Sequence, residues 1–204
     1  MIELLHIDCM EYMKGCQENQ FDLAIVDPPY GIGDFQQSDG NYTPVQWNET
    51  RPSKEYFTQL KRISKNQIIW GANYYNCFNE NGAAIIWDKM NPHPNMSTCE
   101  IASKSFGKKV DYYKYEWQGY TVKRVEPNSF HPCQKPIQLY KWLLMNYAKP
   151  GDTIFDSHGG SMSLAIAAYD LGFDCTICEI DKDYYQDAVK RFNNHKAQLQ
   201  LQFS

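Results

Sequence analysis

Short apolar runs alternate along the chain with longer stretches whose apolar residues recur every three or four positions. Runs rich in β-branched and aromatic residues that stop at polar or turn-forming residues are typical of buried parallel strands. The strands predicted in this way cover 2–6, 21–26, 67–70, 83–87, 153–155 and 174–179. The helices predicted from the longer period cover 11–16, 52–62, 136–148, 161–171 and 181–197. Because strand and helix alternate, we expect an α/β fold with a doubly wound, mostly parallel sheet.

A chain of 204 residues has the length of one domain, and no linker-like stretch divides it. We predict a single domain over 1–204 with a small inserted region over 88–130. The apolar share of 43% excludes the disordered and fibrous classes of protein. No stretch approaches the ~18 consecutive apolar residues that span a bilayer, and the first residues do not resemble a secretion signal. We therefore expect a soluble, cytoplasmic protein without a membrane partner.

Seven cysteines lie along the chain, and two of them, Cys175 and Cys178, form a C-x-x-C pair. Such a pair can bind zinc when a second pair of Cys or His residues completes the site. Here no second pair has that spacing, and positions i and i+3 of a strand point to opposite faces of a sheet. We therefore predict reduced thiols and no metal site.

Charge is unevenly distributed along the chain. The formal net charge of −4 argues against a partner rich in phosphate. Residues 88–141, however, carry nine Lys and Arg against five Asp and Glu, with aromatic residues among the bases. Basic charge beside stacking surface suits a nucleic-acid groove, although a solvated, tyrosine-rich β-hairpin has the same composition. The bases that we expect to contact DNA are Lys104, Lys108, Lys109, Lys123 and Arg124.

The tetrapeptide Asp27-Pro28-Pro29-Tyr30 directly follows the predicted strand at 21–26. Ligands of open α/β sheets bind at the carboxyl ends of the strands, so these residues are candidates for an active site. An amino group on an aromatic ring is a weak nucleophile, and two acceptors, the Asp27 carboxylate and the Pro28 carbonyl, can hold both of its N–H bonds. The prolines fix the backbone, and Tyr30 offers a face on which a flipped-out base can stack.

Four segments, in this order, resemble motifs of the amino-directed DNA methyltransferases. They are residues 5–9 with 21–32, the sequence H-P-C-Q-K-P at 131–136, residues 149–161, and residues 178–181. The catalytic segment precedes the cofactor segment, which is the arrangement of the permuted β-class of this family. The resemblance implies the methyltransferase fold with a small recognition region. It also implies transfer of a methyl group from S-adenosyl-L-methionine to an exocyclic amino group in double-stranded DNA.

The resemblance further implies which residues bind S-adenosyl-L-methionine. The backbone from Asp156 to Ser161 would cradle the methionine part, and Glu179 would accept hydrogen bonds from the ribose. Asp8 would lie near the adenine, with a helix N-cap as its alternative role. Lys135 would belong to the lid that follows the recognition region. The implied cofactor-binding residues are Asp8, Lys135, Phe155, Asp156, His158, Gly160, Ser161 and Glu179.

The cofactor loop departs from the family pattern at two positions. His158 stands where the family has Phe, and Met162 stands where it has Gly. A residue with a Cβ adopts a positive φ only at a cost, although Gly159 and Gly160 offer that freedom nearby. A titratable ring at position 158 either makes cofactor binding depend on pH or only fills the aromatic position.

The leading hypothesis is site-specific methylation of adenine at N6, because the D-P-P-Y form is more typical of adenine enzymes in this family. One alternative is methylation of cytosine at N4 by the same machinery. Another is a homologue with weakened catalysis that binds DNA or a protein partner. The predicted recognition region is short, so either the recognised sequence is brief, or a second copy or second subunit completes the contact with DNA.

Overall fold

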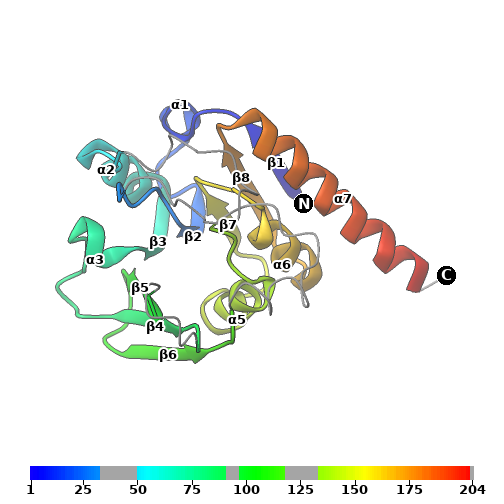
Figure 1. Ribbon diagram of the computed structural model, residues 1–204. Coiled ribbons are helices and arrows are strands. Elements are labelled where there is room, and N and C mark those ends of the chain that lie inside the picture. Colours follow the sequence, from blue (N-terminus) through cyan, green and yellow to red (C-terminus); the bar gives the residue numbers. More distant parts are fainter. Residues whose placement is uncertain (33–49, 91–96, 118–132, 203–204) are drawn as a thin grey trace.

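An eight-stranded sheet forms the centre of the computed structural model, which describes residues 1–32, 50–90, 97–117 and 133–202 (Figure 1). The strands are β1 (Ile2–His6), β2 (Phe21–Val26), β3 (Ser64–Trp70), β4 (Ala84–Asp88), β5 (Cys99–Lys104), β6 (Val110–Lys114), β7 (Thr153–Asp156) and β8 (Asp174–Glu179). Their order is β1-β8-β7-β2-β3-β5-β4-β6. Among these described strands, β5 is antiparallel to both of its neighbours and all other pairs are parallel. The predicted mostly parallel sheet is confirmed.

Helices cover both faces of this sheet (Figure 1). They are α1 (Cys9–Gly15), α2 (Lys54–Ile63), α3 (Ala72–Tyr75), α5 (Ile137–Tyr147), α6 (Ser163–Leu171) and α7 (Lys182–Gln202). The five predicted helices are confirmed, with ends that differ by one to a few residues. Capping explains where α2 begins, because the Ser53 hydroxyl accepts a hydrogen bond from the backbone N–H of Tyr56.

Alternate residues of the strands pack into two separate cores. In β2, Leu23 and Ile25 belong to the core that α5, α6 and α7 cover, whereas Ala24 belongs to the core that α1 and α2 cover. Cys175 and Cys178 of β8 also lie in opposite cores, as the spacing of this pair predicts. Within the described residues, no group of three or more His, Cys, Asp or Glu is placed to hold a metal ion. A search of the same residues finds no helix that could cross a membrane.

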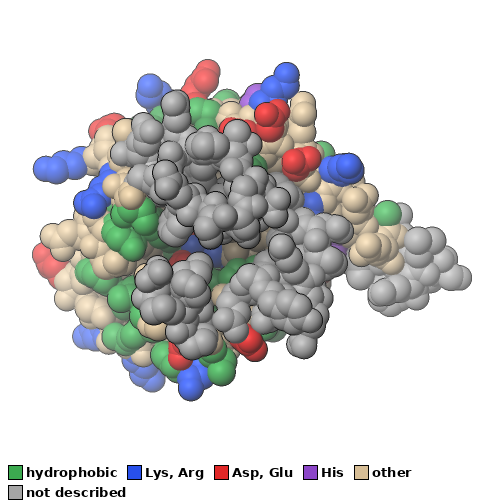
Figure 2. Space-filling view, in the orientation of Figure 1, with side chains coloured by type: hydrophobic (Ala, Val, Ile, Leu, Met, Phe, Trp, Pro, Cys, Tyr) green, Lys and Arg blue, Asp and Glu red, His purple; other side chains and the backbone are tan. Residues whose placement is uncertain are grey.

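The region predicted as an insertion, 88–130, contributes strands β5 and β6 to the central sheet. β5 pairs with β3 and β4, and β6 pairs with β4 at one edge of the sheet. The described part of this region is therefore continuous with the sheet. On the face seen in Figure 2, the Lys and Arg side chains of the described residues are scattered among Asp and Glu. Residues 118–130 lie outside the described residues, so a recognition region over 88–130 stays a prediction.

Candidate active site

Asp27 is the first residue after β2 and lies at the carboxyl edge of the sheet. β2 is buried on both faces, and Pro28 has no N–H with which to continue the ladder, so the strand ends here. The neighbouring strands β3, β7 and β8 end at the same edge with Trp70, Asp156 and Glu179. Because β2 and β7 are adjacent, the fold brings the predicted catalytic segment beside the predicted cofactor segment.

A buried network of charged side chains surrounds Asp27. The ammonium of Lys135 donates to Asp27 Oδ2 and lies 2.9 Å from Glu100 Oε2. The other carboxylate oxygen of Glu100, Oε1, lies 2.5 Å from Lys89 Nζ. Only 4% of the Lys135 side chain is exposed. Two carboxylates and two ammonium groups therefore compensate one another in a region largely shielded from water.

The members of this network change one another's pKa. Burial would raise the pKa of Glu100, but Lys135 and Lys89 outweigh it and lower this pKa to about 2. Burial would lower the pKa of Lys135, but Asp27 and Glu100 raise it above its usual value. Burial raises the pKa of Asp27, and Lys135 opposes this increase. The two lysines therefore favour the charged form of Glu100, whereas burial works against the charge on Asp27.

Tyrosine hydroxyls fix the two oxygen acceptors after β2. Tyr30 Oη donates to Asp27 Oδ1 over 2.6 Å. Tyr75 Oη donates to the carbonyl of Pro28 and lies 2.9 Å from the carbonyl of Pro29. A carboxylate accepts about four hydrogen bonds and a carbonyl about two. Both the Asp27 carboxylate and the Pro28 carbonyl therefore keep capacity for a further donor, such as an N–H of an amino group.

The ring of Tyr30 is held between aromatic and glycine neighbours. It stacks on Tyr74 with ring centroids 4.8 Å apart and an interplanar angle of 18°. At Gly71, φ is +73° and a Cβ would lie 2.4 Å from Tyr30 Cε1, so this position requires glycine on both counts. Arg51 donates to the backbone carbonyls of Tyr30 and Tyr74 over 3.1 and 2.8 Å. Tyr30 is thus held by two separate segments of the chain, α3 with its N-cap Gly71 and the segment that contains Arg51.

Glu179 holds the loop that follows β7. One carboxylate oxygen accepts from the backbone N–H of Gly160 over 2.7 Å, and the other accepts from that of Asp181 over 2.8 Å. Gly159 lies directly against β8, where a Cβ would be 2.6 Å from Ile177 Cγ2. A larger residue at position 159 would therefore push the loop away from the end of β8.

Asp156 and Ser161 occupy the two ends of this loop, and both are buried. Asp156 Oδ1 accepts from the backbone N–H of His158 over 3.0 Å, and burial raises the pKa of Asp156 well above its usual value. The carbonyl of Ser161 accepts from Arg191 of α7 over 2.7 Å. The loop is therefore fastened to the body of the protein along its length.

Met162 adopts the backbone conformation that the sequence analysis associated with glycine. Its φ is +55°, and it precedes α6 as the N-cap residue. This left-handed conformation costs a residue with a Cβ roughly 1–2 kcal/mol. The Met162 side chain is fully buried in the core, and such burial stabilises by roughly 1.5–3 kcal/mol. The absence of glycine therefore does not prevent the positive φ, because core packing offsets its cost.

His158 fills an aromatic position and stays neutral. Its Nδ1 lies 2.8 Å from Ser157 Oγ, which lies 2.6 Å from Tyr56 Oη of α2. The rings of His158 and Tyr56 meet edge to face, with centroids 5.5 Å apart. Burial lowers the pKa of His158 to about 4, so the ring is uncharged at neutral pH. This favours a packing role over a pH-dependent role in cofactor binding.

We expect the free energy of unfolding to fall as the pH drops from 6.5 to about 4, in part because of His158. In this pH range His158 is protonated in the unfolded chain but not in the folded protein, which destabilises the fold by at most about 3 kcal/mol. His158→Phe should remove this contribution, so the free energy of unfolding of the variant should increase relative to that of the parent as the pH falls. Urea denaturation across this range measures the difference. The exposed His6 gives the control variant His6→Phe, and a difference at position 158 that stays constant with pH would contradict the prediction.

Two predicted site residues have side chains that belong elsewhere. Phe155 is fully buried and its ring stacks on Phe21 with centroids 4.8 Å apart, so its side chain is part of the core. Lys104 is buried as well, pairs with Asp111 and lies 4.8 Å from the ring centroid of Tyr147. The prediction that Lys104 contacts DNA is therefore wrong, because β5 directs this side chain into the protein.

The other predicted residues are placed as follows. Lys135 contacts Asp27 and Glu100, and its role in cofactor binding stays a prediction. Asp8 accepts from the backbone N–H of Met10 over 2.7 Å and caps α1, which is its alternative role. Two of the remaining predicted DNA contacts, Lys108 and Lys109, are exposed between β5 and β6. The other two, Lys123 and Arg124, lie outside the described residues.

Sequence analysis did not find Glu100, Lys89 or Tyr75, although all three lie in the candidate site. None of them belongs to a segment that resembles a family motif. The signal that points to Glu100 is the need of the buried Lys135 for a second anionic partner, and this need is visible only in the structure.

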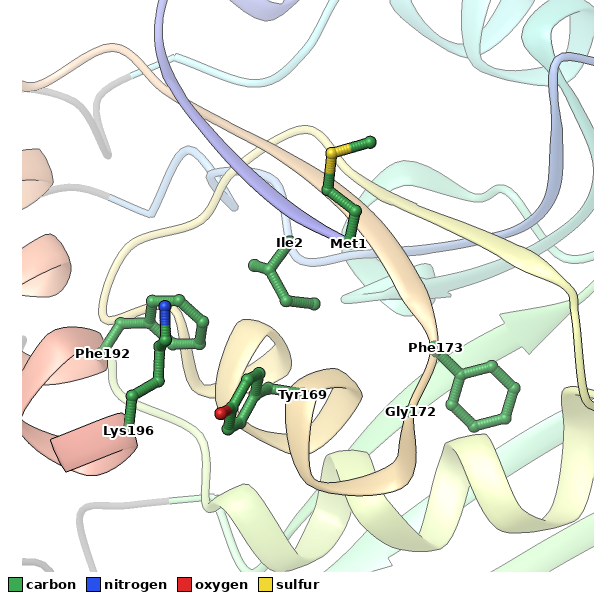
Figure 3. A pocket seen from close by; sticks show the side chains of 7 residues that line it. All are labelled: Met1, Ile2, Tyr169, Gly172, Phe173, Phe192 and Lys196. Carbon is green, nitrogen blue, oxygen red and sulfur yellow. The ribbon is translucent and has the colours of Figure 1, made fainter. Parts of the chain in front are cut away.

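A pocket of about 300 Å³ lies away from this site, between the start of β1, the end of α6 and α7 (Figure 3). Its lining includes Met1, Tyr169 and Phe192, with Lys196 near both aromatic rings. Because Met1 precedes the amino end of β1, the pocket is at the edge of the sheet opposite to Asp27. It therefore adds no residue to the candidate site.

The family model described as DNA methylase (N6_N4_Mtase) matches residues 65–190, which is more than half of the sequence. The chain belongs to this DNA methylase family. Among its relatives, the type II methyltransferase M2.DpnII of Streptococcus pneumoniae is 26% identical over 92% of this methylase and 88% of the relative. The DNA adenine methyltransferase YhdJ of Escherichia coli is 21% identical over 93% of this methylase and 82% of the relative.

Solved structures also resemble this methylase. The crystal structure of the M1.HpyAVI–SAM complex superimposes with a TM-score of 0.65 and 22% identity, covering 94% of this chain and 100% of that chain. The cytosine-N4-specific PvuII DNA methyltransferase gives the same TM-score at 13% identity, covering 94% and 86%. These similarities confirm the fold.

Proposed function

We propose that this methylase transfers a methyl group from S-adenosyl-L-methionine to the exocyclic N6 of a specific adenine in double-stranded DNA. The observation that carries the proposal is the pair of acceptors after β2, the Asp27 carboxylate and the Pro28 carbonyl, beside the stacked ring of Tyr30. Two acceptors match the two N–H donors of an amino group. The partly exposed ring of Tyr30 would stack on a base that has left the double helix.

The acceptors contribute to the reaction by orientation and by charge. When Asp27 accepts one N–H and Pro28 accepts the other, the nitrogen lone pair is drawn out of conjugation with the base and held in one direction. Fixing a reacting group in this way supplies a large part of many catalytic effects. The negative charge of Asp27 also stabilises the positive charge that develops on the nitrogen as the new bond forms. Lys135 and Tyr75 keep the two acceptors in place.

The loop after β7 and the end of β8 fit the cofactor. S-adenosyl-L-methionine supplies an electrophilic methyl group on a sulfonium. Each oxygen of Glu179 uses one lone pair on a backbone N–H and keeps another, which suits the ribose hydroxyls. The backbone from Asp156 to Ser161 would hold the methionine part. Asp8, exposed at the start of α1, would lie near the adenine of the cofactor.

Contact with DNA is proposed for the recognition region over 88–130. Lys108 and Lys109 are exposed in the turn between β5 and β6, where they are available to phosphates. A second copy of the chain or a second subunit would complete the contact if the recognised sequence is long. Sedimentation of the chain with and without duplex DNA distinguishes these arrangements.

The test of the function is product analysis. The purified chain is incubated with labelled S-adenosyl-L-methionine and double-stranded DNA, and the digested nucleosides are analysed by mass spectrometry. We expect N6-methyladenine, in line with the D-P-P-Y segment and with the name of the E. coli relative. Formation of N4-methylcytosine would show that the target base is cytosine and not adenine. Binding of cofactor without any methylation would favour the alternative of a homologue with weakened catalysis.

A further inference from the structure

Glu100 lies at the active-site edge because β5 runs against its neighbours. Parallel strands bring their last residues to the carboxyl edge of the sheet, whereas the antiparallel β5 brings its first residues there. Glu100 pairs in register with Trp87 of β4. Its carboxylate thereby lies between Lys135, which precedes α5, and Lys89, which follows β4.

Glu100 and Asp27 share the ammonium of Lys135. This group has three N–H donors. It contacts Asp27 Oδ2 and Glu100 Oε2, and it lies 3.3 Å from Tyr30 Oη. Glu100 is held from its other side by Lys89. The ammonium of Lys135 is therefore fixed against Asp27 from several directions.

We infer that Glu100 is a positioning residue of the methyl-transfer site: it holds the Lys135 ammonium against Asp27, and Lys135 in turn keeps Asp27 charged and oriented to accept the substrate amino group. The inference rests on the proposed function. Glu100 acts through Lys135, so it needs no contact with the base or the cofactor.

A role in stability alone accounts less well for this arrangement. Burying charged groups costs free energy that their attraction often fails to recover, and apolar residues of similar volume frequently give a more stable protein. Here three charged groups form a chain of ion pairs that ends at the Asp27 carboxylate, beside the stacked Tyr30 ring. The only member that meets the proposed substrate is Asp27. The network is therefore explained by what it does to Asp27.

The titration of Asp27 reports on this role. Other titratable groups that face the network from the segments packed around it are Tyr30, Tyr75, Cys133, Tyr140 and Asp156. Burial raises the pKa values of the tyrosines above their usual value and that of Cys133 to about 12, so they stay protonated near neutral pH. Asp156 also has a raised pKa, but a change at position 135 acts first on Asp27, which Lys135 contacts directly.

The experiment compares the pH dependence of kcat/KM in a single and a double variant. Lys135→Met leaves two carboxylates without the cation between them, so the pKa of Asp27 rises and the acid limb of the profile moves to higher pH. Adding Glu100→Gln removes the neighbouring negative charge, and the acid limb should return toward lower pH by about one unit or more. Because Glu100 is inferred to act through Lys135, adding Glu100→Gln to Lys135→Met should not lower kcat at the pH plateau any further, whereas a residue that acted only on folding would lower it in either background.

Single variants test the positioning role at the pH plateau. Glu100→Gln should lower kcat about tenfold and leave the Kd of S-adenosyl-L-methionine unchanged, because one charged partner of Lys135 is lost. Lys89→Met removes the second cation that holds Glu100, so it should lower kcat by a smaller factor. This variant tests the inference if Glu100→Gln fails to fold. Asp170→Asn is the matched control, because Asp170 is also a largely buried carboxylate that pairs with a lysine, Lys141, but it lies on α6 outside the network. It should keep the parental kcat.

Two results would overturn the inference. One is a parental kcat in both Glu100→Gln and Lys89→Met. The other is a kcat at the pH plateau that falls about tenfold further when Glu100→Gln is added to Lys135→Met. Both results presuppose that the parent chain methylates DNA. A parent that binds duplex DNA and cofactor without methylation overturns the proposed function, and the inference falls with it.

Discussion

Asp27→Ala should lower kcat for DNA methylation by at least about 10³-fold while cofactor affinity changes little. The substitution removes the acceptor that orients the amino group and the charge that stabilises the developing cation. The Pro28 carbonyl remains, but one acceptor alone does not fix the direction of the nitrogen lone pair. Glu179 and the loop after β7 are untouched, so S-adenosyl-L-methionine should still bind. Single-turnover methylation and calorimetry measure the two effects separately.

Asp22→Ala is the matched control for this variant. Asp22 lies on β2, the strand that Asp27 follows, and like Asp27 it pairs with a lysine, with Lys65 Nζ 2.6 Å from its Oδ1. It is near the other end of β2, however, far from the stacked Tyr30 ring. The control should lose some stability, because Asp22 also accepts from Thr153, and keep its kcat. Substantial activity in Asp27→Ala would show that the amino group is held elsewhere.

Glu179→Ala should weaken binding of S-adenosyl-L-methionine by about 10²-fold or more and leave kcat at saturating cofactor largely intact. Two hydrogen bonds from ribose hydroxyls to a carboxylate contribute roughly 1.5–3 kcal/mol each. The substitution also frees the backbone N–H groups of Gly160 and Asp181, so the loop loses its anchor at the end of β8. Asp27→Ala and Glu179→Ala thus affect different steps, which is the pattern expected of separate substrate and cofactor sites.

Calorimetric titration with S-adenosyl-L-methionine checks this second prediction. Glu3→Ala provides the control, because Glu3 is exposed on the neighbouring strand β1 and contacts only the Thr176 hydroxyl of β8 among the polar groups described. The control should bind the cofactor as the parent does. An unchanged Kd in Glu179→Ala would mean that the ribose is bound by another residue.

Those parts of the site that follow strands with a clear apolar pattern could be predicted from sequence. The run Phe21–Val26 ends at Asp27, and the run in β8 ends at Glu179, so both acids could be placed at the carboxyl edge before the structure was known. The spacing of Cys175 and Cys178 likewise predicted their opposite faces. In each case the local pattern alone determines where the residue lies.

The residues that could not be predicted depend on how distant strands pair. β5 lies in a stretch whose composition also suits a solvated hairpin, and only its antiparallel pairing with β3 and β4 puts Glu100 near Asp27. The same pairing buries Lys104, for which the basic, aromatic-rich composition of residues 88–141 predicts contact with DNA. Lone charges in a sequence do not reveal which of them find a buried partner, because the partner comes from another part of the chain.

The order of the strands in the sheet also affects how this methylase folds during its synthesis. β1 pairs with β8, and the hydrogen bond of 3.1 Å between His6 Nε2 and Ile180 O joins residues 174 positions apart. β2 likewise lacks its neighbour β7 until that later strand has been synthesised. At a translation rate of about 5–20 residues per second, β1 remains without its neighbour for roughly 10–35 s. Apolar strand edges exposed for that long favour aggregation, so we expect the nascent chain to depend on chaperones until β8 has left the ribosome.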